Sequence, residues 1–439
     1  MNQSGSASAL ASSGASEAAP LVIRKVSTQT QSDDQSNTKS TSRVVNRWRV
    51  RSRIQRLLRG ALPESEWGRV NRCGWSMGAL VTLLGASGGR ASWSGVEHCN
   101  SVWSCPCCAA RIREGRRTEI LKAVHQARER KWRMFFVTFT VPHDRETPLK
   151  ESLRGLTEAF RRIRNYKSLT PFWSAMVGFI KAVEVQVGSN GFHPHLHVLV
   201  MTNGCDLISG DIESRLKSSW ATAVVKEGLA KPSEKVGVVV EETLDPESTA
   251  DYLVKVQENK LTLEMSRSDL KSGREGKSDG EWHCSPFDLM TKEIELPISI
   301  GLRKKLFVEF YKATKGVSAI RWSRGLKDLF SLEEVSDDDL GTLTPEEAEA
   351  HLRFLRATYT RLFKEAPDLL ARCQELFRAG KYEEAGELAG DYAELLLDDG
   401  TLDDENVELP PDPWASVPDP WASDLDRNDT SDEEPDWGI

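Results

Sequence analysis

The sequence predicts an α+β protein whose core is a ferredoxin-like antiparallel sheet flanked by helices. Two segments alternate apolar and polar residues, as half-buried strands do, and Gly188-Ser189-Asn190-Gly191 joins them as a hairpin turn. Segments with helical spacing of apolar residues separate this hairpin from further strands on both sides. The resulting order of strand, helix, strand, strand, helix, strand and helix is that of a ferredoxin-like sandwich.

The elements of this core follow one another within residues 132–265. Residues 134–141 form a buried apolar strand, and Pro142 ends it because proline has no N–H for the sheet. An amphipathic helix is expected next, at 149–168. After it we expect hairpin strands at 176–187 and 192–201, a helix at 211–227, a strand at 236–242 and a short helix at 246–257.

Composition divides the rest of the chain. The N-terminus is rich in Ser, Thr, Gln and Gly, and the C-terminus is rich in Asp and Glu, so both ends are expected to be disordered. We expect a disordered tail at 1–42, a basic arm at 43–72, a cysteine cluster with a helix at 73–131, a flexible loop at 266–281, a C-terminal helical part of the core at 282–330, an acidic helical domain at 331–397 and a disordered acidic tail at 398–439.

The net charge of −8 conceals a division along the chain. Residues 331–439 hold 31 Asp+Glu and 8 Lys+Arg, a net charge of −23, which leaves 50 basic and 35 acidic side chains, or +15, in residues 1–330. A basic body with an acidic tail is typical of nucleic-acid-binding proteins. Seven arginines fall between Arg43 and Arg59, where they either contact a phosphate backbone or form a solvated basic face.

The sequence shows neither a membrane-spanning segment nor a secretion signal. The chain has no run of eighteen apolar residues, so no transmembrane helix is expected. Residues 1–20 lack the basic and apolar regions of a signal peptide, so we expect a cytoplasmic protein.

Three histidines at alternate positions, His193, His195 and His197, lie on the second hairpin strand. Alternate residues of a strand share one face, and imidazole is the commonest metal ligand in proteins. If Val187 faces Phe192 across the turn, Glu184 lies opposite His195, within about 5 Å at Cβ.

One carboxylate with two or three imidazoles suits a hard or borderline cation such as Mg²⁺ or Mn²⁺. The alternative is a polar strand face with surface histidines.

Five of the eight cysteines lie within 73–108. Cys105 and Cys108 form a C-x₂-C pair, with two further ligands upstream at Cys73 and Cys99, which is the pattern of a structural zinc site. Cys107 and His98 remain outside this set. The alternative is a group of small buried thiols.

Residues 70–330 resemble the Rep initiators of rolling-circle plasmids, in the single-tyrosine branch of the HUH endonucleases. The first motif is similar to FVTFTVPH at 136–143, the metal motif to GFHPHLHVLV at 191–200, and the nucleophile motif to ADYLVK at 250–255. FYKATKG at 310–316 with IRWSRGL at 320–326 resembles the C-terminal block of actinobacterial-type plasmid Reps, here with an N-terminal cysteine cluster.

The resemblance implies an HUH nicking domain at 132–265 that binds the double-strand origin of a plasmid and nicks one strand. Tyr252 would attack a phosphodiester, keep a 5′-phosphotyrosine, free a 3′-OH primer and later rejoin the strand. His195, His197 and Glu184 would hold the metal, with His193 as a ligand or just behind the ligands. Lys255, three residues after Tyr252 and on the same helix face, would assist the scissile phosphate.

One position departs from the family. Relatives often carry a Glu four residues before the tyrosine to activate water at termination, whereas here Ser248 stands there and Glu247 comes five before. Glu247, Asp251 and Glu242 are the candidates. The chain has no P-loop, so a host helicase and a single-strand-binding protein are expected partners, because unwinding needs a motor.

Three alternatives stay open. An HUH transposase or a conjugative relaxase would share the chemistry, and a zinc-containing DNA-binding regulator would have none. The acidic tail repeats PDPWAS at 411–416 and 418–423, either as a docking motif for a protein partner or as a duplication without function.

Overall fold

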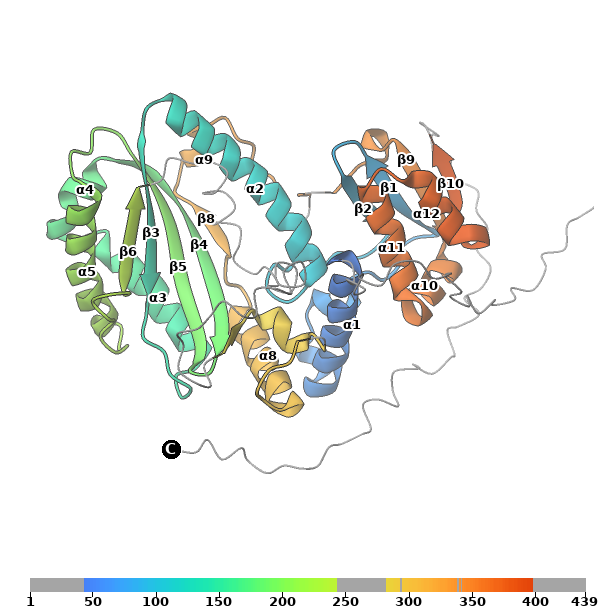
Figure 1. Cartoon of the computed structure of the whole chain (residues 1–439), viewed down its shortest axis with the longest axis horizontal. Coiled ribbons are helices and arrows are strands. Elements are labelled where there is room, and N and C mark those ends of the chain that lie inside the picture. Colours follow the sequence, from blue (N-terminus) through green and yellow to red (C-terminus); the bar gives the residue numbers. More distant parts are fainter. Residues whose placement is uncertain (1–42, 243–281, 293, 338, 341, 398–439) are drawn as a thin grey trace, which may run out of the picture. The chain divides into compact units, whose positions relative to one another are not determined.

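The computed structural model describes residues 43–242, 282–292, 294–337, 339, 340 and 342–397. Within them the chain forms two antiparallel sheets flanked by helices, so the predicted α+β class is confirmed (Figure 1). None of the helices in this described part has the length and apolar content that a membrane crossing requires.

The larger sheet has the strand order β6-β3-β5-β4-β7, and β8 also pairs with β4. All of these neighbours are antiparallel. The strands are β3 (Arg133–Thr140), β4 (Met176–Gly188), β5 (Gly191–Thr202), β6 (Val238–Glu242), β7 (His283–Cys284) and β8 (Ile320–Trp322).

Helices α3 (Leu149–Ile163), α4 (Thr170–Ser174) and α5 (Ser209–Lys226) cover one face of this sheet (Figure 1). The ring of Phe139 on β3 packs against Phe160 of α3 and Trp220 of α5, with centroids 5.6 and 4.7 Å apart. Phe139 pairs with Leu196 on β5, so these two share the helix-covered face. The histidines alternate with Leu196 and therefore face the other way.

Three further helices follow from local signals. Helix α2 (Pro106–Glu129) begins where the Cys105 side chain caps it and proline takes the first turn. Helix α8 (Ile300–Thr314) begins at Ser299, whose hydroxyl accepts from the amide of Leu302. Helix α9 (Leu326–Leu329) is a single turn. Short 3₁₀ turns occupy Glu64–Glu66, Arg69–Arg72, Lys167–Leu169, Pro286–Met290, Pro345–Glu347 and Gly390–Tyr392.

The smaller sheet has the order β10-β9-β1-β2 and corrects the sequence expectation for residues 331–397. That segment contains the expected helices α10 (Arg356–Glu365), α11 (Pro367–Arg378) and α12 (Tyr382–Ala389), but also two strands. These are β9 (Ala350–Leu355) and β10 (Glu394–Leu397), and β9 pairs with β1 (Leu80–Ala86), which pairs with β2 (Arg90–Ser94). The segment is therefore not an independent helical domain, because its strands need a partner from the region of the cysteines.

Helix α1 (Arg43–Ala61) differs from the basic arm expected at 43–72. Its apolar residues fall on one stripe and are buried in the core, including Trp48, Ile54 and Leu58. The indole Nε1 of Trp48 donates to Gln374 at 3.1 Å. The arginines do not project from a free arm, because burial of this apolar stripe holds the helix against α11.

Candidate functional site

The hairpin has the register that the sequence predicts. Val187 pairs with Phe192, and Glu184 pairs with His195. On the other side of β5, Thr140 of β3 pairs with His195 and Thr138 pairs with His197. Three neighbouring strands therefore place two imidazoles, two hydroxyls and one carboxylate on the face that α3 and α5 leave uncovered.

The hydroxyls and the carboxylate orient the two imidazoles. The Oγ1 of Thr138 lies 3.1 Å from Nδ1 of His197, and the Oγ1 of Thr140 lies 3.2 Å from Nδ1 of His195. The Nε2 of His197 lies 2.8 Å from Oε2 of Glu184. Since a hydroxyl can donate or accept, it can hold an imidazole in either tautomer and leave Nε2 to a metal ion or a carboxylate.

Burial favours the neutral form of the His195 imidazole. Burial lowers the pKa of His195 to about 4, and the nearby His197 adds to this effect. Burial by itself would raise the pKa of Glu184, but the hydrogen bonds from His197 and Gln186 and the charge interactions with His197 and His195 together lower it. A neutral imidazole beside an ionised carboxylate is in the protonation state that binding a divalent cation requires.

Two further histidines gather at this end of the sheet, and the sequence analysis assigned neither of them. His143 stacks on His193 with ring centroids 3.8 Å apart, and His283 of β7 lies 6.5 Å from His193. Burial, together with the neighbouring histidines, lowers the pKa of His193 to about 2. His143 ends the first quoted motif, which was the available signal, whereas nothing in the sequence pointed to His283.

Tyr252, Lys255 and Glu247 lie outside the described residues. Among the described tyrosines, Tyr311 is buried, and its phenol donates to the carbonyl of Glu66 at 3.3 Å. Burial raises the pKa of Tyr311, which makes its phenol harder to ionise.

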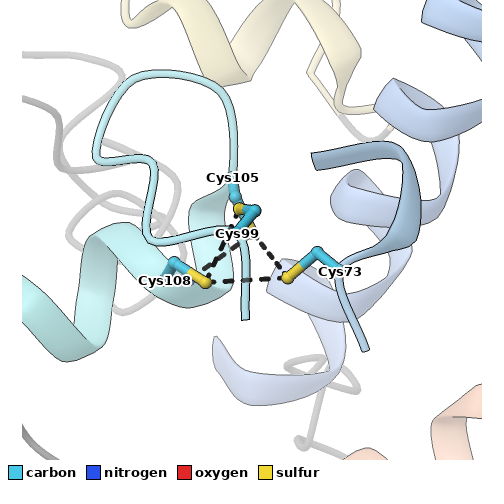
Figure 2. Close-up of side chains that lie close together, drawn as sticks. All are labelled: Cys73, Cys99, Cys105 and Cys108. Atoms are coloured by element: carbon cyan, nitrogen blue, oxygen red, sulfur yellow. Dashed lines mark hydrogen bonds between the residues drawn. The ribbon is translucent and has the colours of Figure 1, made fainter. Parts of the chain in front are cut away.

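The four predicted zinc cysteines form a compact cluster. Their sulfurs all lie within 4.8 Å of one another and are buried, and they point toward a common centre (Figure 2). Cys73 lies 3.6 Å from both Cys105 and Cys108, and Cys99 lies 3.7 Å from Cys108, measured between Sγ atoms. These are not disulfide distances, which are about 2.05 Å. Tetrahedral coordination with Zn–S bonds of about 2.3 Å separates the sulfurs by about 3.8 Å, so the cluster could hold a metal ion such as zinc.

Segments from three places in the chain build this cluster. Cys105 caps α2 by accepting from the amide of Cys108 at 3.5 Å. Gln55 of α1 donates to the carbonyl of Cys73 at 2.9 Å and fixes the turn that carries it. Burial raises the pKa of Cys105, whereas hydrogen bonds from neighbouring thiols, that of Cys105 first, lower the pKa of Cys108.

Arg51 of α1 is buried beside the cysteines and was not found by sequence reasoning. Its guanidinium lies 4.2 Å from the centroid of the Trp48 ring, and its Nε and Nη2 make no hydrogen bond within the described residues. Burial would lower the pKa of Arg51, but Cys107, Cys73 and Cys105 together hold it above its usual value. Four thiolates around a divalent ion would carry a net charge of −2. The positive charge of Arg51 would partly compensate it.

Comparison with known proteins bears on both sites. Residues 92–205 match a protein family described as "Replication protein". Two relatives bear the name "Protein rep". One, from Streptomyces lividans, is 28% identical over 61% of this chain and 72% of its own length. The other, from Lactiplantibacillus plantarum, is 27% identical over 36% of this chain and 56% of its own length.

These matches support a relation to the Rep family of rolling-circle plasmids. The matched region runs from β2 to the end of β5 and contains Glu184, the three alternating histidines and three of the four clustered cysteines. It ends before Tyr252. No solved structure matches the chain.

Proposed function

We propose that this replication initiator nicks and rejoins one DNA strand at the double-strand origin of its plasmid. The observation that carries the proposal is the pair of imidazoles, His195 and His197, held by threonine hydroxyls beside Glu184. Plasmid replication is what the family supports, and the nicking reaction is the chemistry that this side-chain set is able to perform.

The reaction is a transfer of a phosphodiester to tyrosine. Mg²⁺ or Mn²⁺ held by His195, His197 and Glu184 would act as a Lewis acid and draw charge from the scissile phosphate. The phenol oxygen of Tyr252 loses its proton and bonds to phosphorus, the P–O3′ bond breaks, and the leaving oxygen takes up a proton as the 3′-OH primer. Attack of a 3′-OH on the 5′-phosphotyrosine reverses these steps and rejoins the strand, so no nucleotide cofactor is consumed.

Tyr252 has the chain length to reach this face. It lies ten residues after Glu242, the last residue of β6, and an extended chain of ten residues spans about 33 Å. In the sheet β6 lies next to β3, which carries Thr138 and Thr140. Lys255 would place a positive charge near the scissile phosphate.

The last residue of β6, Glu242, is a poor candidate for the acid that acts at termination. Glu242 forms a two-bonded ion pair with Arg133, at 2.8 and 2.9 Å, and this partner lowers its pKa. A carboxylate engaged in this way is a poor general base. We propose Glu247 for this role, with Asp251 as the alternative.

The cysteine cluster would hold zinc in a structural role. All four coordination positions are protein sulfurs, and their burial leaves no position open for substrate. The ion would tie α2 to the turn after α1. The partners of the whole protein would be origin DNA, duplex and single-stranded, a host helicase and a single-strand-binding protein, with the acidic tail binding a further protein in the cytoplasm.

A cleavage assay with supercoiled plasmid DNA tests the proposal. In the presence of Mn²⁺ we expect a relaxed product and a nucleotide adduct on Tyr252, found by peptide mass analysis. Tyr252→Phe should remove both, whereas the matched control Tyr382→Phe, at the start of α12, should change neither.

An adduct on Tyr311 or Tyr166 would keep the reaction and overturn the nucleophile. Tight duplex binding without cleavage under any metal condition would favour a zinc-containing regulator instead.

A further inference from the structure

We infer that a basic groove along α1 binds single-stranded DNA. The groove encloses about 750 Å³ and is built from α1, the turn after Cys73, and α10 with the start of α11. We call it the α1 groove. Its lining includes Arg53, Arg56, Arg59, Trp75, Lys292 and Arg356. None of these belongs to the histidine face or to the four clustered cysteines, so the groove is a second site.

The lining of the α1 groove is strongly positive. Seven cationic side chains line it against two anionic ones, Glu365 and Asp368. Arg49 pairs with Asp368 at 2.5 Å, and Arg361 pairs with Glu365 at 3.1 Å, so both carboxylates already have cationic partners. A chain of phosphates carries one negative charge per nucleotide and therefore complements this positive lining.

The arginines are presented in a row by the geometry of the helix. Arg49, Arg53, Arg56 and Arg59 are spaced three or four residues apart and therefore share one side of α1. The residues between them that enter the core are Val50, Ile54 and Leu58, all buried. A row of charges at this spacing follows a backbone that runs along the helix.

An exposed aromatic ring stands at the end of this row. Trp75 is 45% exposed, although a large indole is normally covered. The guanidinium of Arg59 lies 5.2 Å from the centroid of its ring. An exposed indole beside an arginine provides a stacking surface for a base, the second element of sequence-independent single-strand binding.

Shape favours a single strand over a duplex. A duplex is read by a helix that protrudes into its major groove, about 12 Å wide, whereas α1 lies along a hollow with its apolar side in the core. A volume of about 750 Å³ is in the range of small-ligand sites and suits a few linked nucleotides. The walls are tied by Ser76 and Thr360, whose hydroxyls lie 3.1 Å apart, so the groove is preformed.

The α1 groove would hold the strand that is exposed around the nick while the histidine face acts on the phosphodiester. The inference goes beyond the nicking reaction and does not require it, because the groove residues are separate from those of the proposed chemistry.

Fluorescence anisotropy with a labelled oligothymidylate of about twelve nucleotides tests it. The full chain would carry Tyr252→Phe, without added divalent cation, so that no covalent product forms. We expect Arg56→Glu to weaken binding by about 10-fold or more, and Trp75→Ala by about 5- to 100-fold, because stacking is lost. Trp75→Phe should retain most of the affinity.

Arg154→Glu is the matched control, since it makes the same charge change at an exposed position of α3. Thermal unfolding of each variant separates loss of binding from loss of fold. The inference is overturned if Arg56→Glu and Trp75→Ala bind like Arg154→Glu, or if unlabelled duplex of equal length competes as well as the single strand.

Failure here would leave nicking by the unsubstituted chain intact, whereas failure of the proposed function would leave oligonucleotide binding intact.

Discussion

The two candidate metal centres are built in opposite ways. The histidine face rests on one hairpin and its neighbouring strand, and it would use two kinds of ligand. The cysteine cluster gathers four identical ligands, all buried, from segments up to 35 residues apart. Catalytic metal sites keep positions open, whereas structural sites are closed. We therefore expect the first centre to keep its fold without an ion, and the second to depend on one.

The largest expected effect is at the cysteine cluster. Cys105→Ser should remove zinc and unfold the region around α2 and the turn after α1, because a structural zinc site contributes on the order of 10 kcal/mol to folding. Metal content by mass spectrometry and thermal unfolding measure this. Cys107→Ser, at a neighbouring cysteine outside the set, should retain both zinc and stability. A Cys105→Ser protein with one full equivalent of zinc would contradict the assignment.

The histidine face should show a large effect on activity without one on folding. His197→Ala removes a ligand and the partner of Glu184, so nicking should fall by roughly 1,000-fold, a loss on the scale of one essential electrostatic contact. The unfolding temperature should stay within a few degrees. His125→Ala, at an exposed position of α2, serves as the control. Unchanged nicking in His197→Ala would remove this residue from the site.

Arg51 tests whether the charge of the cysteine cluster needs a buried cation. Arg51→Met keeps most of the side-chain volume and removes the charge, so zinc affinity should fall by about 10- to 100-fold. Competition with a chelator measures the affinity. Arg51→Lys should recover part of the loss, whereas a purely packing role for Arg51 predicts that Met and Lys behave alike.

Replacing a threonine tests whether its hydroxyl positions the neighbouring imidazole for metal binding. Thr138→Val keeps the shape and removes the hydroxyl beside Nδ1 of His197, so Mn²⁺ affinity should fall by about 10-fold. Mn²⁺ titration by calorimetry measures it. Thr222→Val, at an exposed position of α5, should leave the affinity unchanged.

The dependence of stability on pH gives a further test of the histidine face. The folded pKa of His195, about 4, lies below its unfolded value near 6.5, so between these values the unfolded chain binds more protons. Stability is therefore full above pH 6.5 and falls as the pH drops toward 4, by about 1 kcal/mol for each pH unit. Denaturant unfolding at several pH values should show that His195→Gln flattens this slope, and an unaltered slope would refute the buried neutral state.

Local sequence patterns were sufficient to predict most of the histidine face. The Gly188-Ser189-Asn190-Gly191 turn fixes the register of β4 and β5, and the register fixes which residues share a face. The opposition of Glu184 and His195 could thus be counted from the turn. The roles of Thr138 and Thr140 could not, because β3 is separated from β5 by a helix and a further strand, and no turn sets that pairing.

Strand pairing between distant segments explains why β9 could not be predicted from the sequence. The strand β9 pairs with β1, about 270 residues earlier, and its six residues alternate too briefly to be separated from the helices that follow. The basic stretch 43–59 was predicted to contact a phosphate backbone or to form a solvated basic face. The packing of α1 decides which of its arginines line the groove and which one is buried beside the cysteines.

By itself, the sequence determined the α+β class, the hairpin register and the four clustered cysteines, because each follows from spacing along a short stretch of chain. Only the tertiary structure decided that Arg51 lies beside the cysteines, that His143 stacks on His193, and that α1 forms one wall of a basic groove. These depend on contacts between segments far apart in the chain, which the packing of the whole core selects and which no local pattern encodes.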